Sequence, residues 1–557
     1  MGSLISRAKL LIGAIYHLNK ALDVLSRRLK ESPGIPIPNP TQPFWTIPKS
    51  NISAEGKTVP QHADIVIIGS GITGASFAYN VFEQETSLRI VMLEARDICS
   101  GATARYASTS HFRHDSIDHR LCRNGGHINP PLYHDYSELK EQHGEEIAKK
   151  MIHFRLAHFR ELMSIAKAED IFELSQVRRT ENFDVHTTAK TFDKAKEELA
   201  AWQADMPIEA ASFQVDEGVD ASSKFGLSSE VVGCIHGDGG AIHPYRFVTS
   251  LLSRLLDRNP HNFFISTHNP CTEIESPTST CPFYTVHTPK GTITTYHVIH
   301  ATNGWVSHLL SPLREKIIPA RGTMSAQRPG TTLNTKSTLT GERSYVFYSG
   351  TLGYDYLTQL PSGENELMFG GGWASAMDAA FADIGTVDDS QYNWPVASHL
   401  AGALPFYFGA ENWGREKDPE ETEDDKKGGV KWGSGRTKAS WSGILGISAD
   451  GLPWVGRVPT KLSGRSEPSQ SCTPRVPPKE VGETISGGPL LTSPPGEWIS
   501  AGYTGEGMVH AWMSGKALAF MVLNDEEGVR EWFPEILRVS EKRWKKADIV
   551  DYISRRL

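Results

Sequence analysis

The sequence predicts a globular protein of mixed α/β class with more than one domain. A chain of 557 residues suits about two to four domains. Hydrophobic residues make up 39% and charged residues 22% of it, and 13 Trp, 16 Tyr and 22 Phe are present, which is too apolar for a disordered chain. Residues 63–94 follow the pattern strand, glycine turn, helix and strand, which is the repeating unit of a parallel sheet covered by helices.

Residues 1–32 predict a basic amphipathic helix. The basic side chains of residues 1–30 outnumber the acidic ones, and the start Met1-Gly2-Ser3-Leu4-Ile5-Ser6 fits the pattern for acylation of Gly2. These features predict peripheral contact of residues 1–30 with an anionic membrane, with docking on the body of the protein or a targeting role as alternatives. Apolar residues recur at the period of one helical face, at Leu4, Ala8, Leu11, Ile15, Leu18, Leu22, Leu25 and Leu29.

Three other segments have unusual composition. Residues 33–60 begin with PGIPIPNPTQPFWTIP, a run of prolines that predicts an extended strap or linker. Residues 415–436 are highly charged and residues 461–496 are rich in Ser, Pro, Thr and Gly, so both predict surface insertions without a chemical role.

Composition also limits location and partners. The six cysteines form no C-x-x-C pair, which favours reduced intracellular thiols and no metal site. The net charge of −8 opposes nucleic-acid binding. Since no apolar run approaches the ~18 residues that cross a bilayer, the sequence predicts an intracellular, cytoplasmic protein whose membrane association would depend on residues 1–30.

A dinucleotide-binding fingerprint lies in residues 63–94. Gly69 permits a tight turn, Gly71 lets the backbone approach a pyrophosphate, and Gly74 lets the following helix pack against the strand. The helix N-terminus offers free N–H groups to phosphates, and Glu94 follows the second strand, where a carboxylate binds a ribose. The residues assigned to this unit are Gly69, Gly71, Ile72, Thr73, Gly74, Glu94 and Ala95.

Motifs at separate places in the chain point to one family. The run CSGATAR ends at Arg105, RNGGH begins at Arg123, and GYTGEGM precedes a helical stretch near the C-terminus. Together with the fingerprint, they resemble the FAD-dependent oxidoreductases of the D-amino-acid oxidase superfamily, in the fungal-type branch near γ-glutamylputrescine oxidase and the sarcosine and glycine oxidases. The resemblance covers roughly residues 38–545 and implies FAD as the cofactor.

The resemblance implies further cofactor contacts. The diphosphate and flavin loop would be Ser100, Thr103, Arg105, Asn124, Gly125 and Gly126, and Cys271 would mark the adenine site. Ala301, Thr302 and Asn303 resemble a second cofactor turn, for which an ordinary strand end is the alternative. Thr504, Gly505, Gly507 and Met508 would begin the last helix, whose N-terminus favours negative charge on the flavin, with a plain helix start as the alternative.

Two departures from the family pattern concern the flavin. Gly443 stands near the place where sarcosine oxidases carry the cysteine that binds FAD covalently, so FAD is expected to be non-covalent. Met368 lies in the segment where those enzymes keep a lysine that assists the reaction with oxygen, so oxygen is not assured as the acceptor.

The resemblance also implies two interleaved domains, a Rossmann-like FAD-binding domain and a substrate domain built on a large mixed sheet. The expected FAD-binding parts are 61–127, 226–309 and 437–545, the substrate parts are 128–225 and 310–414, and 546–557 is a tail.

The implied activity is oxidation of a C–N bond in a small amine or amino acid. A hydride passes to flavin N5, the imine hydrolyses, and oxygen is reduced to hydrogen peroxide. His127 is the candidate catalytic residue at the flavin, with a loop hydrogen-bonding role as the alternative. Tyr354 and Tyr356 line the pocket or the core, and Arg321 binds a substrate carboxylate or forms a structural ion pair. Two other functions stay open, a membrane-associated dehydrogenase that reduces a quinone and a non-catalytic FAD-binding protein.

Residues 106–123 interrupt the family motif, and their removal restores SGATARNGGH. Three interpretations are open: a metal site, a surface loop, and a retained intron, which is favoured because 18 codons keep the reading frame. The metal ligands would be His111, His114, Asp118, His119 and Cys122.

Overall fold

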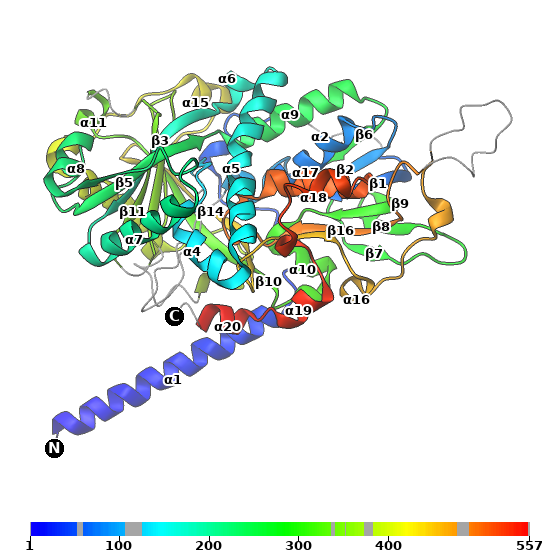
Figure 1. The fold of residues 1–557 in the computed structure, drawn as a ribbon, viewed down its shortest axis with the longest axis horizontal. Coiled ribbons are helices and arrows are strands. Elements are labelled where there is room, and N and C mark those ends of the chain that lie inside the picture. The colour runs from blue at the N-terminus through cyan, green and yellow to red at the C-terminus, as the bar shows by residue number, and fades with distance from the viewer. Residues whose placement is uncertain are drawn as a thin grey trace.

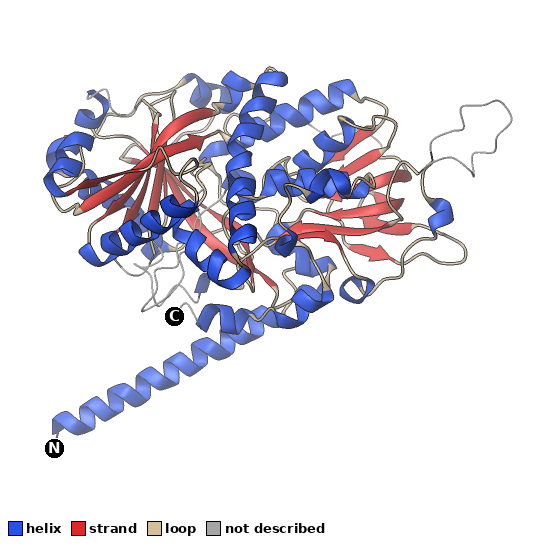
Figure 2. Cartoon of the chain, in the orientation of Figure 1, coloured by secondary structure: helices blue, strands red, loops and turns tan. Residues whose placement is uncertain are grey.

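A computed structural model describes residues 2–52, 59–105, 125–335, 340–350, 353–372, 382–475 and 490–554. In this part of the chain, two eight-stranded sheets stand beside each other with helices around and between them (Figures 1 and 2). The predicted fold class, a parallel α/β unit joined to a large mixed sheet, is confirmed.

The first sheet contains the glycine fingerprint. Its strands follow the order β15-β16-β9-β1-β2-β6, in which β16, β9, β1, β2 and β6 run parallel, while β7 and β8 extend it from β9. The strand β1 is nearly continuous in buried apolar residues because a parallel sheet is covered on both faces. The bounds are β1 His62–Ile68, β2 Ile90–Leu93, β6 Phe263–Ser266, β7 Glu273–Glu275, β8 Tyr284–Thr288, β9 Gly291–His300, β15 Trp454–Arg457 and β16 Gly496–Ala501.

The second sheet follows the order β14-β10-β13-β12-β11-β3-β5-β4. Its pairs are antiparallel except for β11 and β3, which run parallel. The bounds are β3 Arg178–His186, β4 Gln214–Glu217, β5 Gly233–Ala241, β10 Ile317–Gln327, β11 Arg343–Tyr348, β12 Asp355–Gln359, β13 Leu367–Gly370 and β14 Thr437–Ser448.

Two strands lie outside the sheet expected from the sequence. The strand β5 falls within 226–309 and β14 within 437–545, ranges assigned to the FAD-binding domain, but both pair in the second sheet. The strand β14 pairs with β10 along its length, from Ser448 opposite Ile317 to Thr437 opposite Gln327. The two FAD-binding parts predicted to start at residues 226 and 437 therefore start later in the chain. The chain returns to the first sheet only after β5 and after β14.

Helices cover both sheets and fill the space between them. The helices α2 and α17 pack on each other, α9 packs on α2, and the long α5 stands between the two sheets and contacts α4 and α17 (Figure 1). Their bounds are α2 Ile72–Phe82, α3 Ala102–Arg105, α4 Leu132–His143, α5 Glu145–Ala168, α6 Phe172–Ser175, α7 Ala189–Asp205, α8 Gly218–Phe225, α9 Pro244–Arg258, α10 Val306–Leu309, α11 Thr331–Thr335, α13 Trp394–Phe408, α14 Ala410–Trp413, α15 Glu423–Gly428, α16 Thr460–Ser463, α17 Ala511–Val522, α18 Glu527–Arg530, α19 Glu541–Lys546 and α20 Ile549–Ser554.

The N-terminal helix α1 (Gly2–Lys30) projects from the body of the protein (Figure 1). Its last turns dock there, because Leu25 and Leu29 are buried in an apolar cluster and Arg28 Nη1 donates a 2.7 Å hydrogen bond to the carbonyl of Ala382. Ile12 and Tyr16 are 66% and 65% exposed. The docking interpretation therefore holds for the end of this helix, and membrane contact of its exposed part stays a prediction. None of the described helices combines the length and apolar character needed to cross a bilayer.

The charged segment 415–436 is not confined to the surface. Its helix α15 carries Asp425, whose buried carboxylate lies 2.9 Å from Lys438 Nζ on β14. Glu364 and Glu366 surround the same ammonium at 2.7 and 2.8 Å, and the Lys438 side chain is fully buried. This four-residue ion cluster anchors the segment to the second sheet.

The described part of the segment 461–496 is also attached to the body. Arg465 binds the buried Glu497 of β16 through Nε and Nη2, each at 2.7 Å from a carboxylate oxygen. His300 Nε2 at the end of β9 lies 2.8 Å from the same carboxylate. This ion cluster ties the segment to two neighbouring strands of the first sheet.

Candidate cofactor site and active site

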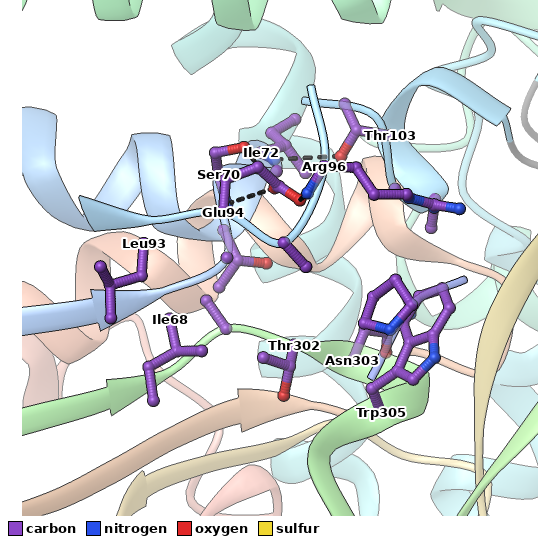
Figure 3. A pocket seen from close by; sticks show the side chains of 18 of the residues that line it. Ile68, Ser70, Ile72, Leu93, Glu94, Arg96, Thr103, Thr302, Asn303 and Trp305 are labelled. Atoms are coloured by element: carbon purple, nitrogen blue, oxygen red, sulfur yellow. Dashed lines mark hydrogen bonds between the residues drawn. The ribbon is translucent and has the colours of Figure 1, made fainter. Parts of the chain in front are cut away.

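A cavity opens where β1, β2 and β9 end in the first sheet (Figure 3). The carboxyl ends of parallel strands form one edge of a sheet, which is where open α/β sheets bind ligands. The walls come from residues 34–36, the glycine turn, residues 93–96, 101–103, 270–271, 301–309 and the segment 503–511. Seven separate parts of the chain thus meet at one site.

The glycine turn brings the backbone close to this cavity. Gly69 has a φ of +111°, and a Cβ there would lie 2.5 Å from the carbonyl oxygen of Ala301. A Cβ at Gly74 would collide with the carbonyl oxygen of Gly69, so α2 can approach the turn only without a side chain there. The amide of Ile72 donates a 3.0 Å hydrogen bond to Thr103 Oγ1, which fixes the start of α2 against the cofactor loop (Figure 3).

Glu94 is held at the end of β2 by three hydrogen bonds. Its Oε2 accepts from the hydroxyl of Ser70 at 2.5 Å and from the Ser70 amide at 3.3 Å. Its Oε1 accepts from the amide of Arg96 at 3.0 Å (Figure 3). Glu94 lines the cavity and is 9% exposed. Its carboxylate is therefore held in position without a ligand.

Two buried arginines of the cofactor loop share one carboxylate. Arg96 Nη1 lies 3.0 and 2.9 Å from the two carboxylate oxygens of Asp389, and Arg105 Nε lies 3.9 Å from the nearer one. Burial and the neighbouring charge of Arg96 together lower the pKa of Arg105 to about 9, and Asp389 only partly opposes them. An anionic ligand would be favoured beside this pair.

Most of the predicted cofactor residues line this cavity. They are Gly69, Gly71, Ile72, Thr73, Glu94, Ala95, Thr103, Cys271, Ala301, Thr302, Asn303, Gly505, Gly507 and Met508. The residues Gly74, Ser100, Arg105, Gly125, Gly126 and Thr504 do not line it, and Asn124, like 106–123, lies outside the described residues. Sequence reasoning missed, among others, Gly34, Ile35, Pro36, Trp305, His308 and Tyr503, although Tyr503 lies within the GYTGEGM motif.

The polar groups of the cavity fit FAD. Thr302 Oγ1 and Trp305 Nε1 are buried and have no hydrogen-bond partner within the described ranges, although both residues line the cavity. Such groups need a partner, which the phosphates, sugars and ring nitrogens of a dinucleotide supply. The turn, the ribose-type carboxylate and the start of α17 lie along one continuous wall.

The segment after β16 connects this cavity to the second sheet. Thr504 donates through its amide to the carbonyl of Gly446 at 2.8 Å, and its hydroxyl accepts from the amide of Ser448 at 3.0 Å. Arg155 of α5 lies 3.3 Å from Glu506 and 2.9 Å from Asp135, with its side chain 2% exposed. The segment is therefore fixed to β14 and to α5.

His127 lies deep in the interface between the sheets. It is fully buried, its ring is edge-on to Tyr356 at 5.9 Å between centroids, and it forms an isolated bridge with Ala241. It lines neither this cavity nor the second one described below. A Cβ at the neighbouring Gly125 would lie 2.7 Å from the carbonyl oxygen of Met368, so the backbone touches β13 directly.

Three other candidates have definite contacts. Gly443 leaves no room for a side chain, because a Cβ there would lie 2.8 Å from Cβ of Arg105. Tyr354 and Tyr356 are buried in the main apolar cluster. Arg321 forms a 2.8 Å ion pair with Asp383, which agrees with the structural alternative for this residue.

A second cavity of about 340 Å³ lies on the second sheet beside α4 and α5. Its wall is polar, with Asn129, Arg155, Asn182 and Asp184 among its residues. The hydroxyl of Tyr133 donates a 2.6 Å hydrogen bond to Asp184, and Asn129 Nδ2 donates to Asn182 Oδ1 at 2.8 Å. Arg155 also binds Glu506, which lies between Gly505 and Gly507 of the first cavity.

Nothing in the described ranges forms a group of three or more His, Cys, Asp and Glu side chains suited to a metal ion. The five cysteines of these ranges are free thiols. The site is therefore built from main-chain, hydroxyl, carboxylate and guanidinium groups.

Comparison with known proteins places these features in context. The family model described as DAO, FAD dependent oxidoreductase, matches residues 64–521. A search of curated proteins found no match. Among solved structures, glycine oxidase from Geobacillus kaustophilus is similar with a TM-score of 0.55 and 15% identity, covering 86% of this chain and 99% of that one.

Two further solved structures share the fold. The L-amino acid deaminase from Proteus vulgaris, with its specific insertion deleted, has a TM-score of 0.53 and 13% identity over 88% of this chain and 96% of its own. The L-proline dehydrogenase from P. horikoshii has a TM-score of 0.52 and 15% identity over 88% of this chain and 100% of its own.

Proposed function

The chain belongs to the DAO family of FAD-dependent oxidoreductases, and from this premise we propose that it oxidises a C–N bond in a small amine or amino acid. The observation that carries the proposal is the continuous cavity that joins the glycine turn and Glu94 to Gly505 and Met508. Glycine oxidase, L-amino acid deaminase and L-proline dehydrogenase share the fold and support this substrate class.

The residues of the first cavity would hold FAD without a covalent bond. When bound, FAD accepts a hydride from the carbon next to nitrogen. The start of α2 would bind the diphosphate, Glu94 a ribose, and Cys271 would lie at the adenine end. Gly443 supports non-covalent binding, because Arg105 occupies the space that a thiol would need.

The second cavity is the proposed place for the polar groups of the substrate. Ile128 lines it directly after His127, and Arg155 joins it to Glu506 next to the cofactor cavity. Nη1 of Arg155 has no hydrogen-bond partner in the part of the chain described, so it can donate to a carboxylate or carbonyl. His127 is proposed to hold the proton of the amine, because imidazole titrates near neutral pH.

The electron acceptor divides the proposal into two forms. Oxygen, reduced to hydrogen peroxide, is the acceptor of an oxidase. A quinone is favoured by two observations, the exposed apolar side chains Ile12 and Tyr16 on α1 and the place of Met368 in the strand where sarcosine oxidases carry a lysine. The second form makes the protein a cytoplasmic enzyme bound at the membrane surface.

An anaerobic screen tests the proposal. Purified protein is mixed with candidate amines, amino acids and hydroxy acids, and loss of the oxidised flavin absorbance is followed. We expect at least one amine or amino acid to bleach the flavin within seconds and hydroxy acids to leave it unchanged. Release of hydrogen peroxide on admission of air identifies the oxidase, and reoxidation only by a quinone identifies the dehydrogenase. A flavin that no compound bleaches would favour a non-catalytic protein.

A further inference from the structure

We propose that residues 32–48, the N-terminal strap, form part of the cofactor site by covering the adenosine half of bound FAD and slowing its release. The inference rests on FAD binding in the first cavity, as the proposed function requires. It concerns a segment that lies outside the range of the family match, 64–521, and that carries no cofactor motif.

The strap lines the adenosine end of the cavity. Gly34, Ile35 and Pro36 line the cavity together with Cys271 and His308, and Ser32, shortly before them in the chain, contacts His308. Ile35 is 43% exposed, although the fold could have buried so apolar a side chain. A flat, largely apolar adenine ring is the kind of surface that Ile35 and Pro36 would cover.

Hydrogen bonds to the cofactor loop and the first domain fix the strap at this position. The hydroxyl of Ser32 lies 3.0 Å from Nδ1 of His308, which itself lines the cavity. Nη1 of Arg96 donates to the carbonyl of Ile37 at 3.4 Å. The strap is thus held on both sides of Ile35.

The second domain holds the following part of the strap. The amide of Thr41 donates to the carbonyl of Asp389 at 2.7 Å, and its hydroxyl donates to the same oxygen at 3.0 Å. The Thr41 hydroxyl also accepts from the amide of Ser442 at 3.0 Å. Since the carboxylate of Asp389 binds Arg96, one residue connects the strap, the cofactor loop and the second domain.

Buried side chains lie at both ends of the strap. Trp45 is 1% exposed and contacts His243 edge-on at 4.8 Å between ring centroids. Before the strap, Leu25 and Leu29 of α1 are buried in the body. Because the intervening prolines restrict the backbone, the strap has little freedom to swing away while both ends are attached. Dissociation of FAD would then require the strap to move first.

The rate of FAD release tests this role. Protein loaded with FAD is diluted, and the flavin that passes a filter is measured over time for the unchanged protein, Ile35→Ser and the control Asn39→Ala. We expect Ile35→Ser to release FAD about tenfold faster, a change equivalent to about 1.4 kcal/mol. Asn39 is an exposed strap residue that does not line the cavity, so its replacement should leave the rate unchanged.

A second variant examines the attachment of the strap. Thr41→Val keeps the shape of the side chain but removes the hydroxyl that joins Asp389 and Ser442, and we expect faster release at an unchanged melting temperature of the flavin-free protein. Release of FAD from Ile35→Ser and Thr41→Val at the rate of the unchanged protein would overturn the strap's role while leaving FAD binding intact. If the protein without substitutions never binds FAD, the proposed function and this inference are both overturned.

Discussion

Gly71 is predicted from the sequence to face the cofactor diphosphate, and it lines the first cavity. It precedes α2 at the edge of the cavity, and a Cβ there would lie 3.0 Å from Thr103 Oγ1. A small shift of that hydroxyl would admit alanine, but a branched side chain would occupy the space in front of the helix N-terminus. The diphosphate of a bound dinucleotide would approach those amides through this space.

We therefore expect Gly71→Val to fold but to lose flavin, to roughly a tenth of the unchanged protein or less. The ratio of flavin to protein absorbance after gel filtration measures it. Gly402→Ala is the matched control, because Gly402 lies in α13 with no atom within 4 Å of its added Cβ. Full flavin content in Gly71→Val would remove the dinucleotide site from this cavity.

The buried carboxylate of Glu497 leads to a prediction about how the stability of the fold depends on pH. Burial opposes its ionisation, but hydrogen bonds from His300 and Arg465 outweigh burial and lower its pKa from 4.5 to about 2. A carboxylate with a depressed pKa stabilises the fold above its unfolded pKa and loses that contribution as the pH falls through the folded value. The shift corresponds to about 3 kcal/mol at neutral pH.

Glu497→Gln should consequently lower the melting temperature at pH 7, and the difference from the unchanged protein should narrow as the pH falls below about 4.5. Circular dichroism melts across that range measure both. Glu467→Gln is a control, because Glu467 lies in the same segment but pairs with Arg457 in a more exposed position. A difference that stays constant with pH would show that the ionised form of Glu497 does not stabilise the fold.

At the scale of elements, α1 is docked at its end and exposed in its projecting part. Its last turns are docked by Leu25 and Leu29, whereas Ile12 and Tyr16, one turn apart on the same face, are exposed. The sequence of the projecting part carries the basic residues Arg7, Lys9 and Lys20. This arrangement favours a helix attached to the body at one end and to an anionic surface at the other.

Vesicle binding tests that arrangement. We expect the protein to sediment with vesicles of phosphatidylserine but not of phosphatidylcholine, and added salt to weaken the binding. Replacing Ile12 and Tyr16 together with aspartate should reduce binding about tenfold or more. Val550→Asp is the control, since Val550 is similarly exposed, at 62%, but lies in α20. Equal binding by both variants would exclude α1 as the contact.

For the whole molecule, local motifs could be predicted from the sequence and long-range partners could not. The glycine turn, Glu94, Cys271 and Gly505 each belong to a short pattern, and all four line the predicted cavity. Asp389 belongs to no pattern, because its role depends on Arg96, which lies 293 positions earlier in the chain. The sheet containing β5 and β14 was misassigned for the same reason, since strand pairing joins distant segments.

Residues 106–123 allow a prediction for the chain as a whole. Their deletion joins Arg105 to Asn124 and restores the family motif, so the shortened protein should bind FAD at least as tightly as the full chain. Fluorescence titration of the flavin-free proteins compares the two affinities. Clearly weaker binding after the deletion would make the segment a required part of the site. Sequencing of the transcript decides independently whether the segment is a retained intron.

The contacts of Thr41 also determine when the strap can be fully attached during synthesis of the chain. Its partners Asp389 and Ser442 lie 348 and 401 residues later in the chain. At the usual pace of translation, the N-terminal segment leaves the ribosome roughly 20 to 70 s before Asp389 is made. During that interval the strap can reach its earlier partners Arg96 and His308 but lacks the attachment at Thr41. The first segment to be synthesised is therefore among the last to be fully attached, and under the proposed role of the strap stable capture of FAD must wait for it.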